Sequence, residues 1–460
     1  MMYAAHTSTS APAHAPLSPA EGGAPSYDVV VVGGGASGLA AAITAAKAGA
    51  RVCVVERDVQ AGLGLLATGN GRCNISNAKL DPRHYLHAHA ARSVFGGEGE
   101  QRIASFFEDI GLMLAQEDEG RLYPLSKRAE SVRDVLLDAC AREEIAILSC
   151  ANILRARRVN EKGAAHWELA LSVPQEPLSY KQGRDAKATI RNARKALAAA
   201  NRCERTLYGA NVIIAVGGRS QAICEVFSLP HLDETPVLCP VACALQQAAG
   251  SPNAAAPTLD ALDGLRAEGM LTLVRDGAAI AFEQGEVLFR PYGISGIAAF
   301  NLSRRLRPDD VIELDLFPTM NEADLLALLC RRVEAIGPFD GSSSWFDGML
   351  ASPLGAVIAR LLTGADDPLR RAATLLHRIP LTVGGTTEHA QAHVHRGGVP
   401  LSAVDLATCA VTHQAEAGPR PGLFACGEAL DMDADCGGFN LAWAWATGMR
   451  AGASAAKGLS

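Results

Sequence analysis

Three glycines and one glutamate near the start of the sequence have the types and spacing of a phosphate-binding turn. Gly33, Gly35 and Gly38 follow the pattern G-x-G-x-x-G, and Glu56 lies 23 positions after Gly33. The first glycine permits a tight turn, the second lets backbone N–H groups approach a pyrophosphate, and the third lets a helix pack closely on a strand. An acidic side chain at this spacing accepts hydrogen bonds from a ribose. The four residues therefore predict a dinucleotide site.

The surrounding residues predict the strand–helix–strand unit that such a turn requires. Residues 29–32 are valines typical of a buried strand, residues 39–47 form an alanine-rich helix that Gly49 can end, and residues 51–55 predict a second strand. The uncharged stretch 29–46 is close to the lower length limit of a membrane span. Its three adjacent glycines would interrupt a membrane helix at high cost, so the pattern favours the βαβ unit over a membrane segment or an ordinary glycine turn.

A second group of candidate residues lies near the C-terminus, after a short predicted strand at 423–426. Its four acids are Glu428, Asp431, Asp433 and Asp435. Their spacing lacks the glycine and the distal glutamate of an EF-hand calcium loop. We expect the first carboxylates to bind hydroxyl groups of a sugar alcohol, and a helix that opens at 437–440 to point its positive end at a bound ring. Both ends of the chain are thus predicted to hold one large cofactor.

Two further glycine-rich segments are expected to bring their backbones to the same ligand. Residues 63–77 are rich in glycine and asparagine, with Arg72 as their single charge. Loops with many backbone donors commonly wrap a cofactor, although a solvated loop is the alternative. Residues 211–220 predict an apolar strand that runs into Gly217 and Gly218. The interval between the two segments predicts helices at 102–111 and 131–142 and one or two strands within 145–159.

Composition limits the class of protein. The 460 residues are 48% hydrophobic, enough for two or three domains, and the net charge of −7 argues against a nucleic-acid-binding protein as a whole. The twelve cysteines form no C-x-x-C pair, and Cys239 and Cys243, the nearest approach to a metal spacing, have no histidine cluster beside them. Buried free thiols and a cytoplasmic location are expected. Residues 1–26 predict a disordered tail without a secretory or mitochondrial signal, and no membrane span is predicted.

Residues 181–205 carry eight basic residues against two acidic ones, Asp185 and Glu204. This segment could contact a nucleic acid or an acidic partner, but it lacks aromatic residues that would stack on bases. We favour the alternative of a solvated, partly disordered insertion between two strands, with bounds 174–205. No nucleic-acid partner is expected.

The middle of the chain predicts a different architecture. Short strand-like runs with turn glycines over residues 236–318 indicate a small barrel or sheet. A helical piece follows, in which Asn321 caps a helix that carries Asp324 at its third position, and Asp367 begins a last helix that ends near His377. The predicted domains are a nucleotide-binding part at 27–225, a barrel-like insertion at 226–318, a helical domain at 319–378 and a second nucleotide-binding part at 379–460.

Seven motifs make the sequence similar to one known family. They are DVVVVGGGASGLAAA, GNGRCNISN, GRLYPLSKRAESV, VIIAVGGRS, LFRPYGISG, TVGGT and GLFACGEALDMDADCGGFNLAWAWATG. With them, residues 27–452 resemble the BaiN/YhiN-type family of FAD-dependent oxidoreductases, also called aminoacetone-oxidase-like flavoproteins. The resemblance implies an α/β fold with a discontinuous Rossmann-type FAD-binding domain, an inserted β-barrel-like domain and a small helical domain.

The resemblance also implies where FAD is held. The ADP half would lie over the first glycine turn and Glu56, and residues 71–74 and the C-terminal motif would surround the ribityl chain and the flavin. Ile153 would touch the adenine through its backbone. The implied cofactor-binding residues are Gly33, Gly35, Ala36, Ser37, Gly38, Glu56, Arg57, Gly71, Arg72, Cys73, Asn74, Ile153, Gly217, Gly218, Glu428, Asp431, Gly438, Phe439, Asn440 and Leu441. No metal is expected.

Two departures from the family pattern bear on the substrate. Family members usually carry basic residues just before the G-R-C-N motif, where this chain has Leu63-Gly64. Many have Thr-His before Tyr-Gly-Ile-Ser-Gly, where this chain has Arg290-Pro291. Proline cannot act as an acid or a base, so any role of that histidine does not transfer. Arg290 and Tyr292 are the substrate-side candidates, with a surface salt bridge and a barrel-packing aromatic as the alternative.

The expected activity is that of an FAD-dependent oxidoreductase, which moves a hydride or two electrons between a small organic substrate and an acceptor such as NAD(P) through the flavin. One complete G-x-G-x-x-G unit is present, so NAD(P)H would dock transiently at the flavin, and oxygen or another acceptor stays open. A peroxide-producing amine oxidase is the alternative among enzymes. A non-catalytic flavin-binding sensor or an RNA-associated module is the alternative from another class.

Overall fold

The computed structural model describes residues 26–161, 164–246, 258–386, 392, 394–412 and 421–457. The predicted disordered tail therefore lies, apart from Ser26, outside the described residues. The chain divides into two compact units, Met1–Glu234 with His395–Ser460, and Thr235–Val394. Each unit has its own hydrophobic core.

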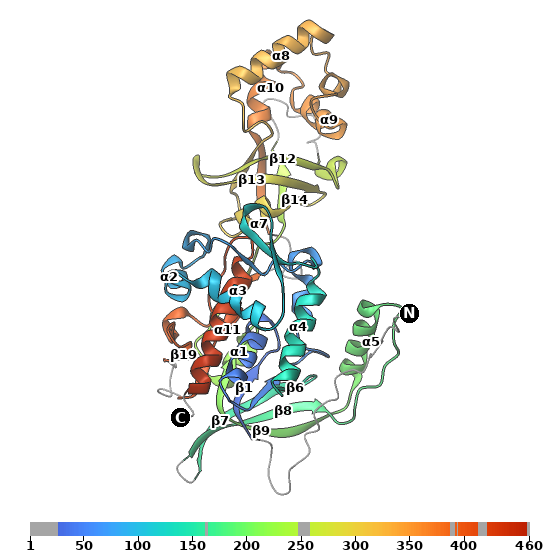
Figure 1. Ribbon diagram of the computed structural model, residues 1–460. Coiled ribbons are helices and arrows are strands. Elements are labelled where there is room, and N and C mark those ends of the chain that lie inside the picture. Colours follow the sequence, from blue (N-terminus) through green and yellow to red (C-terminus); the bar gives the residue numbers. More distant parts are fainter. Residues whose placement is uncertain are drawn as a thin grey trace, which may run out of the picture. The chain divides into compact units, whose positions relative to one another are not determined.

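The first unit is built around a sheet that joins both ends of the chain (Figure 1). β1 pairs in parallel with β2 and with β9, and β9 pairs in parallel with β20 from near the C-terminus. The path runs β18-β19-β20-β9-β1-β2-β6, and β7 and β8 join it at β9. The bounds are β1 Ser26–Val32, β2 Val52–Val55, β6 Ala146–Leu148, β7 Asn152–Glu161, β8 Ala164–Pro174, β9 Arg202–Ile214, β18 Val404–Asp405, β19 Ala410–Val411 and β20 Leu423–Ala425. The predicted Rossmann-type fold and βαβ unit are confirmed.

Two helices of this unit, α1 and α11, pack against each other through small residues. A Cβ on Gly448 would lie 2.3 Å from the carbonyl oxygen of Ser37, and a Cβ on Gly452 would lie 2.2 Å from that of Ala41. Glycine is therefore the residue that permits this close approach. The helices of the unit are α1 Ala36–Lys47, α2 Ala88–Phe95, α3 Gly99–Asp109, α4 Ala129–Arg142, α5 Ala186–Ala199, α6 Gln221–Phe227 and α11 Phe439–Lys457.

Short elements complete the first unit. A small sheet pairs β3 (Ser76–Asn77), β5 (Arg121–Pro124) and β4 (Leu114–Gln116). The 3₁₀ segments are η1 Leu63–Gly71, η2 Pro82–His84, η3 Asp118–Gly120, η7 Leu401–Ala403 and η8 Gly427–Ala429. A two-stranded sheet pairs β10 (Leu232–Val237) with β17 (Val394–Gly398), and each of these strands contains a point at which the chain passes from one unit to the other.

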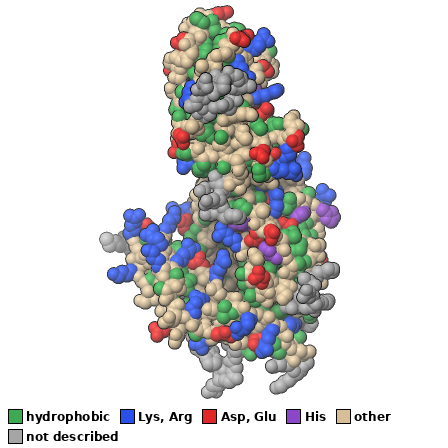
Figure 2. Space-filling view, turned by 180° about the vertical axis from the view of Figure 1, so that it is seen from behind, with side chains coloured by type: hydrophobic (Ala, Val, Ile, Leu, Met, Phe, Trp, Pro, Cys, Tyr) green, Lys and Arg blue, Asp and Glu red, His purple; other side chains and the backbone are tan. Residues whose placement is uncertain are grey.

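The basic segment contains a helix, α5, where partial disorder was expected. Asp185 caps this helix by accepting the N–H of Ala188 at 2.7 Å, and the alanine-rich sequence that follows favours helix. The predicted position between two strands is confirmed, since α5 connects β8 to β9, but the predicted disorder is wrong for these residues. Lys and Arg side chains gather on the side of the first unit that carries α5 (Figure 2).

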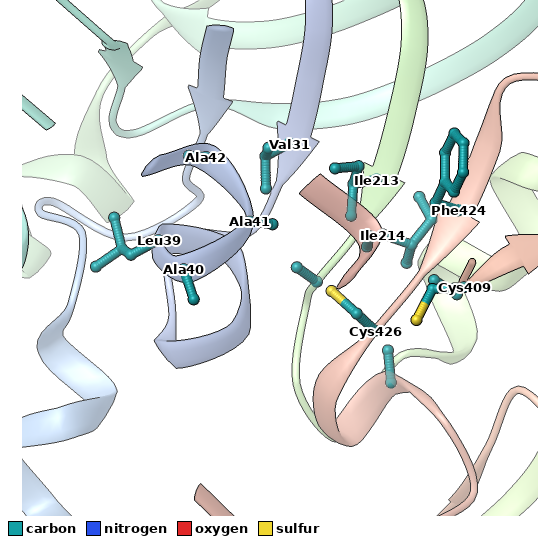
Figure 3. Close-up of a cluster of buried hydrophobic side chains, with 14 of the residues drawn as sticks. Val31, Leu39, Ala40, Ala41, Ala42, Ile213, Ile214, Cys409, Phe424 and Cys426 are labelled. Carbon is teal, nitrogen blue, oxygen red and sulfur yellow. The ribbon is translucent and has the colours of Figure 1, made fainter. Parts of the chain in front are cut away.

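The core of the first unit mixes side chains from both ends of the chain. Figure 3 shows Val31 of β1 and Ala41 of α1 in one cluster with Ile213 of β9, Phe424 of β20 and Cys426. All five are buried. The strands that carry the predicted site residues at their ends are therefore held by a shared core.

The second unit contains the predicted barrel. Its closed order is β11-β14-β13-β12-β15-β16. One predicted boundary is corrected, because β16, expected in the second nucleotide-binding part, pairs with β11 and β15 as a barrel strand and buries Leu381 and Val383. The bounds are β11 Val241–Leu245, β12 Arg266–Arg275, β13 Ala278–Arg290, β14 Gly293–Ser295, β15 Val311–Asp315 and β16 Ile379–Thr386.

The helices that were expected as a separate domain at 319–378 lie in the same compact unit as the barrel and share its core. The Asn321 side chain accepts the N–H of Asp324 at 2.9 Å, and the Asp367 side chain accepts the N–H of Arg370 at 3.1 Å, so both predicted helix starts are confirmed. The elements are α7 Ile297–Ser303, α8 Glu322–Ile336, α9 Ser352–Leu361, α10 Pro368–His377, η4 Leu259–Leu262 and η5 Ser343–Phe346.

The cysteines are free thiols, and nine of the twelve are buried, Cys239 and Cys243 among them. Across the described ranges, no cluster of His, Cys, Asp and Glu could hold a metal ion. None of the described helices is both long and apolar enough to cross a bilayer.

Candidate functional site

The glycine turn after β1 has the geometry of a phosphate-binding turn. Gly33 has φ of +107°, and a Cβ there would lie 2.4 Å from the carbonyl oxygen of Ala215. A Cβ on Gly38 would lie 1.9 Å from the carbonyl oxygen of Gly33, so α1 packs directly on the turn. A Cβ on Gly35, in contrast, would meet no described atom within 4 Å. Packing requires the first and third glycines, whereas the space beside the second is open to a ligand.

The N-terminus of α1 faces this turn with its backbone donors uncapped. Gly35 is the N-cap residue, Ala36 and Ser37 begin the helix, and among the described residues no side chain caps it. The first N–H groups of a helix have no partner within the helix, and the helix dipole adds positive potential at that end. Open space and free donors together suit an anion such as a pyrophosphate.

Glu56 ties the end of β2 to the glycine turn. Its Oε2 accepts the N–H of Gly34 and its Oε1 accepts the N–H of Asp58, both at 2.7 Å. Glycine at position 34 also leaves room for this carboxylate, since a Cβ there would lie 3.1 Å from Oε2. The glutamate therefore shapes the turn, a role that the ribose-binding prediction did not include.

The predicted adenine-side residues lie next to Glu56. The N–H of Ala151 donates to the Glu56 carbonyl at 2.9 Å, which places the start of β7 beside the end of β2. Ile153 is buried two residues further along, and Arg57 is exposed. The structure thus brings together the residues that were predicted from distant parts of the sequence.

The end of β9 meets the acidic C-terminal loop. Gly217 has φ of +72°, and a Cβ on Gly218 would lie 2.6 Å from Glu428 Oε1 and 2.8 Å from His395 Nδ1. The same Glu428 oxygen accepts the backbone N–H of His395 at 2.9 Å. The predicted second glycine approach therefore lies against a glutamate from the other end of the chain.

Asn74 of the G-R-C-N motif connects to the start of α11. With its amide oriented so that the NH₂ group donates to the carbonyls of Ser76 and Leu122, its oxygen accepts the N–H of Gly438 at 3.1 Å. Cys73 beside it is buried with φ of +55°, and burial raises the pKa of its thiol to about 11. At neutral pH this cysteine is a packed thiol and not a thiolate.

Arg72 is held by two partners at the same loop. Gly71, with φ of +81°, precedes Arg72. The Arg72 guanidinium lies 2.5 Å from Glu117 Oε1 and 4.2 Å from the centre of the Tyr123 ring. Arg72 and Lys127 together lower the pKa of the Glu117 carboxyl to about 2. The arginine is thus positioned with its charge balanced.

Each of the four acids in the C-terminal loop is paired with a basic side chain. The pairs are Glu428 with His395 at 3.4 Å, Asp431 with His87 at 3.2 Å, Asp433 with Arg396 at 2.7 and 3.1 Å, and Asp435 with His84 at 3.0 Å. Asp431 also accepts the N–H of Gly397 at 3.0 Å. These partners were not predicted from the sequence, although a cluster of acids beside an apolar helix indicates that hydrogen-bonding partners for the carboxylates must come from elsewhere in the chain.

Phe439 and Asn440 fix the start of α11. The Phe439 ring stacks on His84 with centroids 4.2 Å apart, and the Tyr85 hydroxyl donates to the Phe439 carbonyl at 3.0 Å. The Asn440 side chain accepts the N–H of Ala434 at 2.9 Å and donates to its carbonyl at 2.8 Å. Leu441 is half-buried on the same turn.

The twenty predicted cofactor-binding residues lie in the first unit, and both substrate-side candidates lie in the second. Arg290 forms an ion pair with Asp263 at 3.1 Å, and both side chains are more than 40% exposed. The carbonyl of Tyr292 accepts the N–H of Cys243 at 3.0 Å within the barrel. For Arg290 the geometry matches the surface salt bridge that was the alternative.

The chain is similar to several known proteins over nearly its whole length. The family described as HI0933-like protein Rossmann domain matches residues 27–454. A 3-dehydro-bile acid delta(4,6)-reductase of Clostridium scindens is 27% identical over 453 residues, covering 93% of this chain and 98% of the relative. A ribosomal RNA dihydrouridine synthase of Haemophilus influenzae is 22% identical over 440 residues, covering 91% and 96%. A solved 3-ketosteroid-delta4-(5alpha)-dehydrogenase of Rhodococcus jostii has 14% identity, with 94% of this chain and 97% of that chain covered and a TM-score of 0.45.

Proposed function

The chain belongs to the HI0933-like Rossmann family, and from this premise we propose that it moves a hydride or two electrons between a small organic substrate and NAD(P) through bound FAD. Its class is that of the FAD-dependent oxidoreductases which its motifs resemble. The observation that carries the proposal is the open space beside Gly35, at the uncapped start of α1, in the same unit as the paired acidic loop.

The residues of the first unit fit FAD. The N–H groups at the start of α1 would bind the pyrophosphate, and Glu56 and the backbone near Ile153 would hold the adenosine. Residues 71–74 and the start of α11 would enclose the flavin end, because Asn74 and Gly438 are hydrogen-bonded to each other. When bound, FAD supplies a ring that accepts or gives a hydride at N5. The protein would orient the substrate against that ring.

The reductive direction has the better support. Two relatives that match this chain over nearly their whole length are named as a reductase and as a synthase of a dihydro product. Both names describe products richer in hydrogen. We therefore propose that reducing equivalents pass from NAD(P)H to the flavin and then to an organic acceptor.

An anaerobic titration of the purified, FAD-loaded protein tests this function. Bleaching of the flavin absorbance near its visible maximum by NADPH or NADH, followed by reoxidation with an organic acceptor, is the expected result. Bleaching by an amine, with hydrogen peroxide formed in air, would instead identify an amine oxidase. Absence of bleaching by every donor would leave a flavin-binding protein without this activity and would contradict the proposal.

A further inference from the structure

All four cations of α5 lie on one face of the helix. They are Lys187, Arg191, Arg194 and Lys195, spaced by four, three and one residues, which places them on a common side. The helix carries no acidic residue. Like charges at neighbouring positions on a helix face are destabilising, so this stripe opposes the helix that carries it unless an anion lies against it.

The four cations line a cleft of about 540 Å³ within the first unit. Leu63 and Leu66 of η1 also line the cleft, and Ile190 and Ala198 of α5 add apolar surface. The volume falls in the range of small-molecule sites, roughly 300–1,000 Å³. The cleft therefore combines concentrated positive charge with apolar walls.

One cation anchors α5, and three remain for a ligand. Arg194 binds Asp58 through both carboxylate oxygens, with its Nη2 at 2.5 Å. Asp58 directly follows the Glu56–Arg57 pair of the proposed adenosine site, so the anchor ties α5 to that site. Lys187, Arg191 and Lys195 are exposed. Within the part of the chain that the structure describes, no carboxylate forms an ion pair with any of the three.

We propose that this cleft binds the phosphate groups of NADPH. A nucleotide supplies several negative charges on one small molecule together with flat apolar rings, which matches a cleft lined by both cations and apolar side chains. NADPH carries one more phosphate than NADH, and three cations beyond the anchoring pair suit that extra charge. An extended nucleic acid would need a longer charged surface and stacking aromatics, and none lines this cleft.

The position of the cleft suits an electron donor. Its leucines belong to η1, and η1 leads directly into residues 72–74 of the proposed flavin site. A dinucleotide whose phosphates are bound at α5 could therefore extend along η1 toward the flavin. The inference rests on the proposed function, because it names the donor for the same flavin.

The test compares two triple variants of the full-length, FAD-loaded protein. One is Lys187→Gln, Arg191→Gln and Lys195→Gln, which neutralises the cleft and leaves the Arg194–Asp58 pair intact. The control is Lys181→Gln, Arg184→Gln and Arg205→Gln, which removes the same charge from the same segment outside the cleft. The dissociation constant of NADP⁺ is measured by calorimetry at two salt concentrations, because binding of the oxidised nucleotide requires no turnover.

We expect the cleft variant to raise the dissociation constant of NADP⁺ at least about tenfold, since charge-assisted contacts to phosphate are lost. The control should change it less than about twofold, and NAD⁺ should bind the wild-type protein more weakly than NADP⁺. Salt should weaken NADP⁺ binding to the wild-type protein more than to the cleft variant. FAD content and melting temperature should be unchanged, because removing like charges from one helix face does not weaken the helix.

Equal NADP⁺ affinity in the two variants, or no NADP⁺ binding by the wild-type protein, would overturn the proposal. Loss of binding to an RNA oligonucleotide in the cleft variant, with NADP⁺ affinity retained, would assign the surface to RNA and overturn it as well. The outcome is separable from the proposed function. Cleft-dependent NADP⁺ binding without flavin reduction by NADPH would support the cleft as a nucleotide site and contradict the proposed function. Flavin reduction by NADPH with equal KM in both variants would support the proposed function and contradict the cleft as the nucleotide site.

Discussion

Gly452 of α11 faces the main chain of Ala41 in α1 so closely that a Cβ on the glycine would lie 2.2 Å from the Ala41 carbonyl oxygen. One turn earlier in α11, a Cβ on Gly448 would likewise lie too close to the carbonyl oxygen of Ser37, the second residue of α1. The helix that begins at the acidic loop is therefore in backbone contact with the helix that begins at the glycine turn. This contact sets the spacing between the two halves of the proposed FAD site.

Substituting Gly452 by alanine should destabilise the first unit. Alanine gains about 1 kcal/mol of helix propensity, but overpacking costs about 1–3 kcal/mol, and a main-chain oxygen cannot rotate away as a side chain can. Because the obstructing atom is in the main chain, we take the upper end of the overpacking cost, and the net fall in the free energy of unfolding should be about 2 kcal/mol in urea denaturation. Gly97→Ala is the control, because a Cβ there meets no described atom within 4 Å, and its effect should stay within about 0.5 kcal/mol.

Substitution of Gly35 should separate cofactor binding from folding. Its φ of −84° is accessible to alanine, and its Cβ would point into open space, so the melting temperature of the apoprotein should be unchanged. The added methyl group would occupy space assigned to the pyrophosphate, and the dissociation constant of FAD should rise at least about tenfold by fluorescence titration. Gly38→Ala should prevent folding instead. FAD affinity equal to wild type in Gly35→Ala would contradict the assignment of this turn.

Arg396 should be essential for the acidic loop. Asp433 is fully buried and Arg396 binds both of its oxygens, so Arg396→Gln leaves a buried carboxylate without this cation. Breaking a buried ion pair costs about 3–5 kcal/mol, and because the Arg396 side chain is 30% exposed we take the lower end, about 3 kcal/mol. We expect this loss in urea denaturation, with FAD release at lower urea. Combining Arg396→Gln with Asp433→Asn should recover part of the lost stability. An Arg396→Gln variant as stable as the wild-type protein would show that other partners of Asp433 suffice.

Cys73 should be unreactive in the folded protein at neutral pH. Burial raises the pKa of its thiol from 9.0 to about 11, and the thiolate is the form that alkylates. Iodoacetamide at pH 7.5 should modify the exposed Cys330 first, and Cys73 labelling, read by mass spectrometry, should rise about tenfold per pH unit toward pH 11. Because the folded pKa is the higher one, this thiol stabilises the fold below pH 9, and that contribution falls as the pH rises to 11. Rapid labelling of Cys73 at pH 7.5 would contradict this.

Much of the fold could be predicted because its signals are local. The glycine turn, the valine strand and the helix caps at Asn321 and Asp367 each depend on a few adjacent residues, and all were confirmed. The assignment of residues 379–386 was wrong for a physical reason. A strand that ends in glycines has the same sequence pattern in a barrel as in a nucleotide-binding sheet. Only its pairing with β11 and β15 shows that it belongs to the barrel.

The partners of the acidic loop could not be predicted from local patterns. His84 and His87 pair with Asp435 and Asp431 across most of the length of the chain, and each residue alone resembles an ordinary surface group. Helix α5 was also missed, because a run of cations suggests disorder by charge alone. The cap at Asp185 and the alanines outweigh that repulsion.

The parallel pairing of β9 with β20 has a consequence for biosynthesis. After Ile214 leaves the ribosome, one edge of the central sheet has no neighbour until Leu423 is made, and every residue of the barrel unit is translated in between. An unpaired strand edge is a template for association with other chains. We therefore expect nascent or truncated chains that stop before residue 423 to need chaperones and to aggregate when overproduced without them.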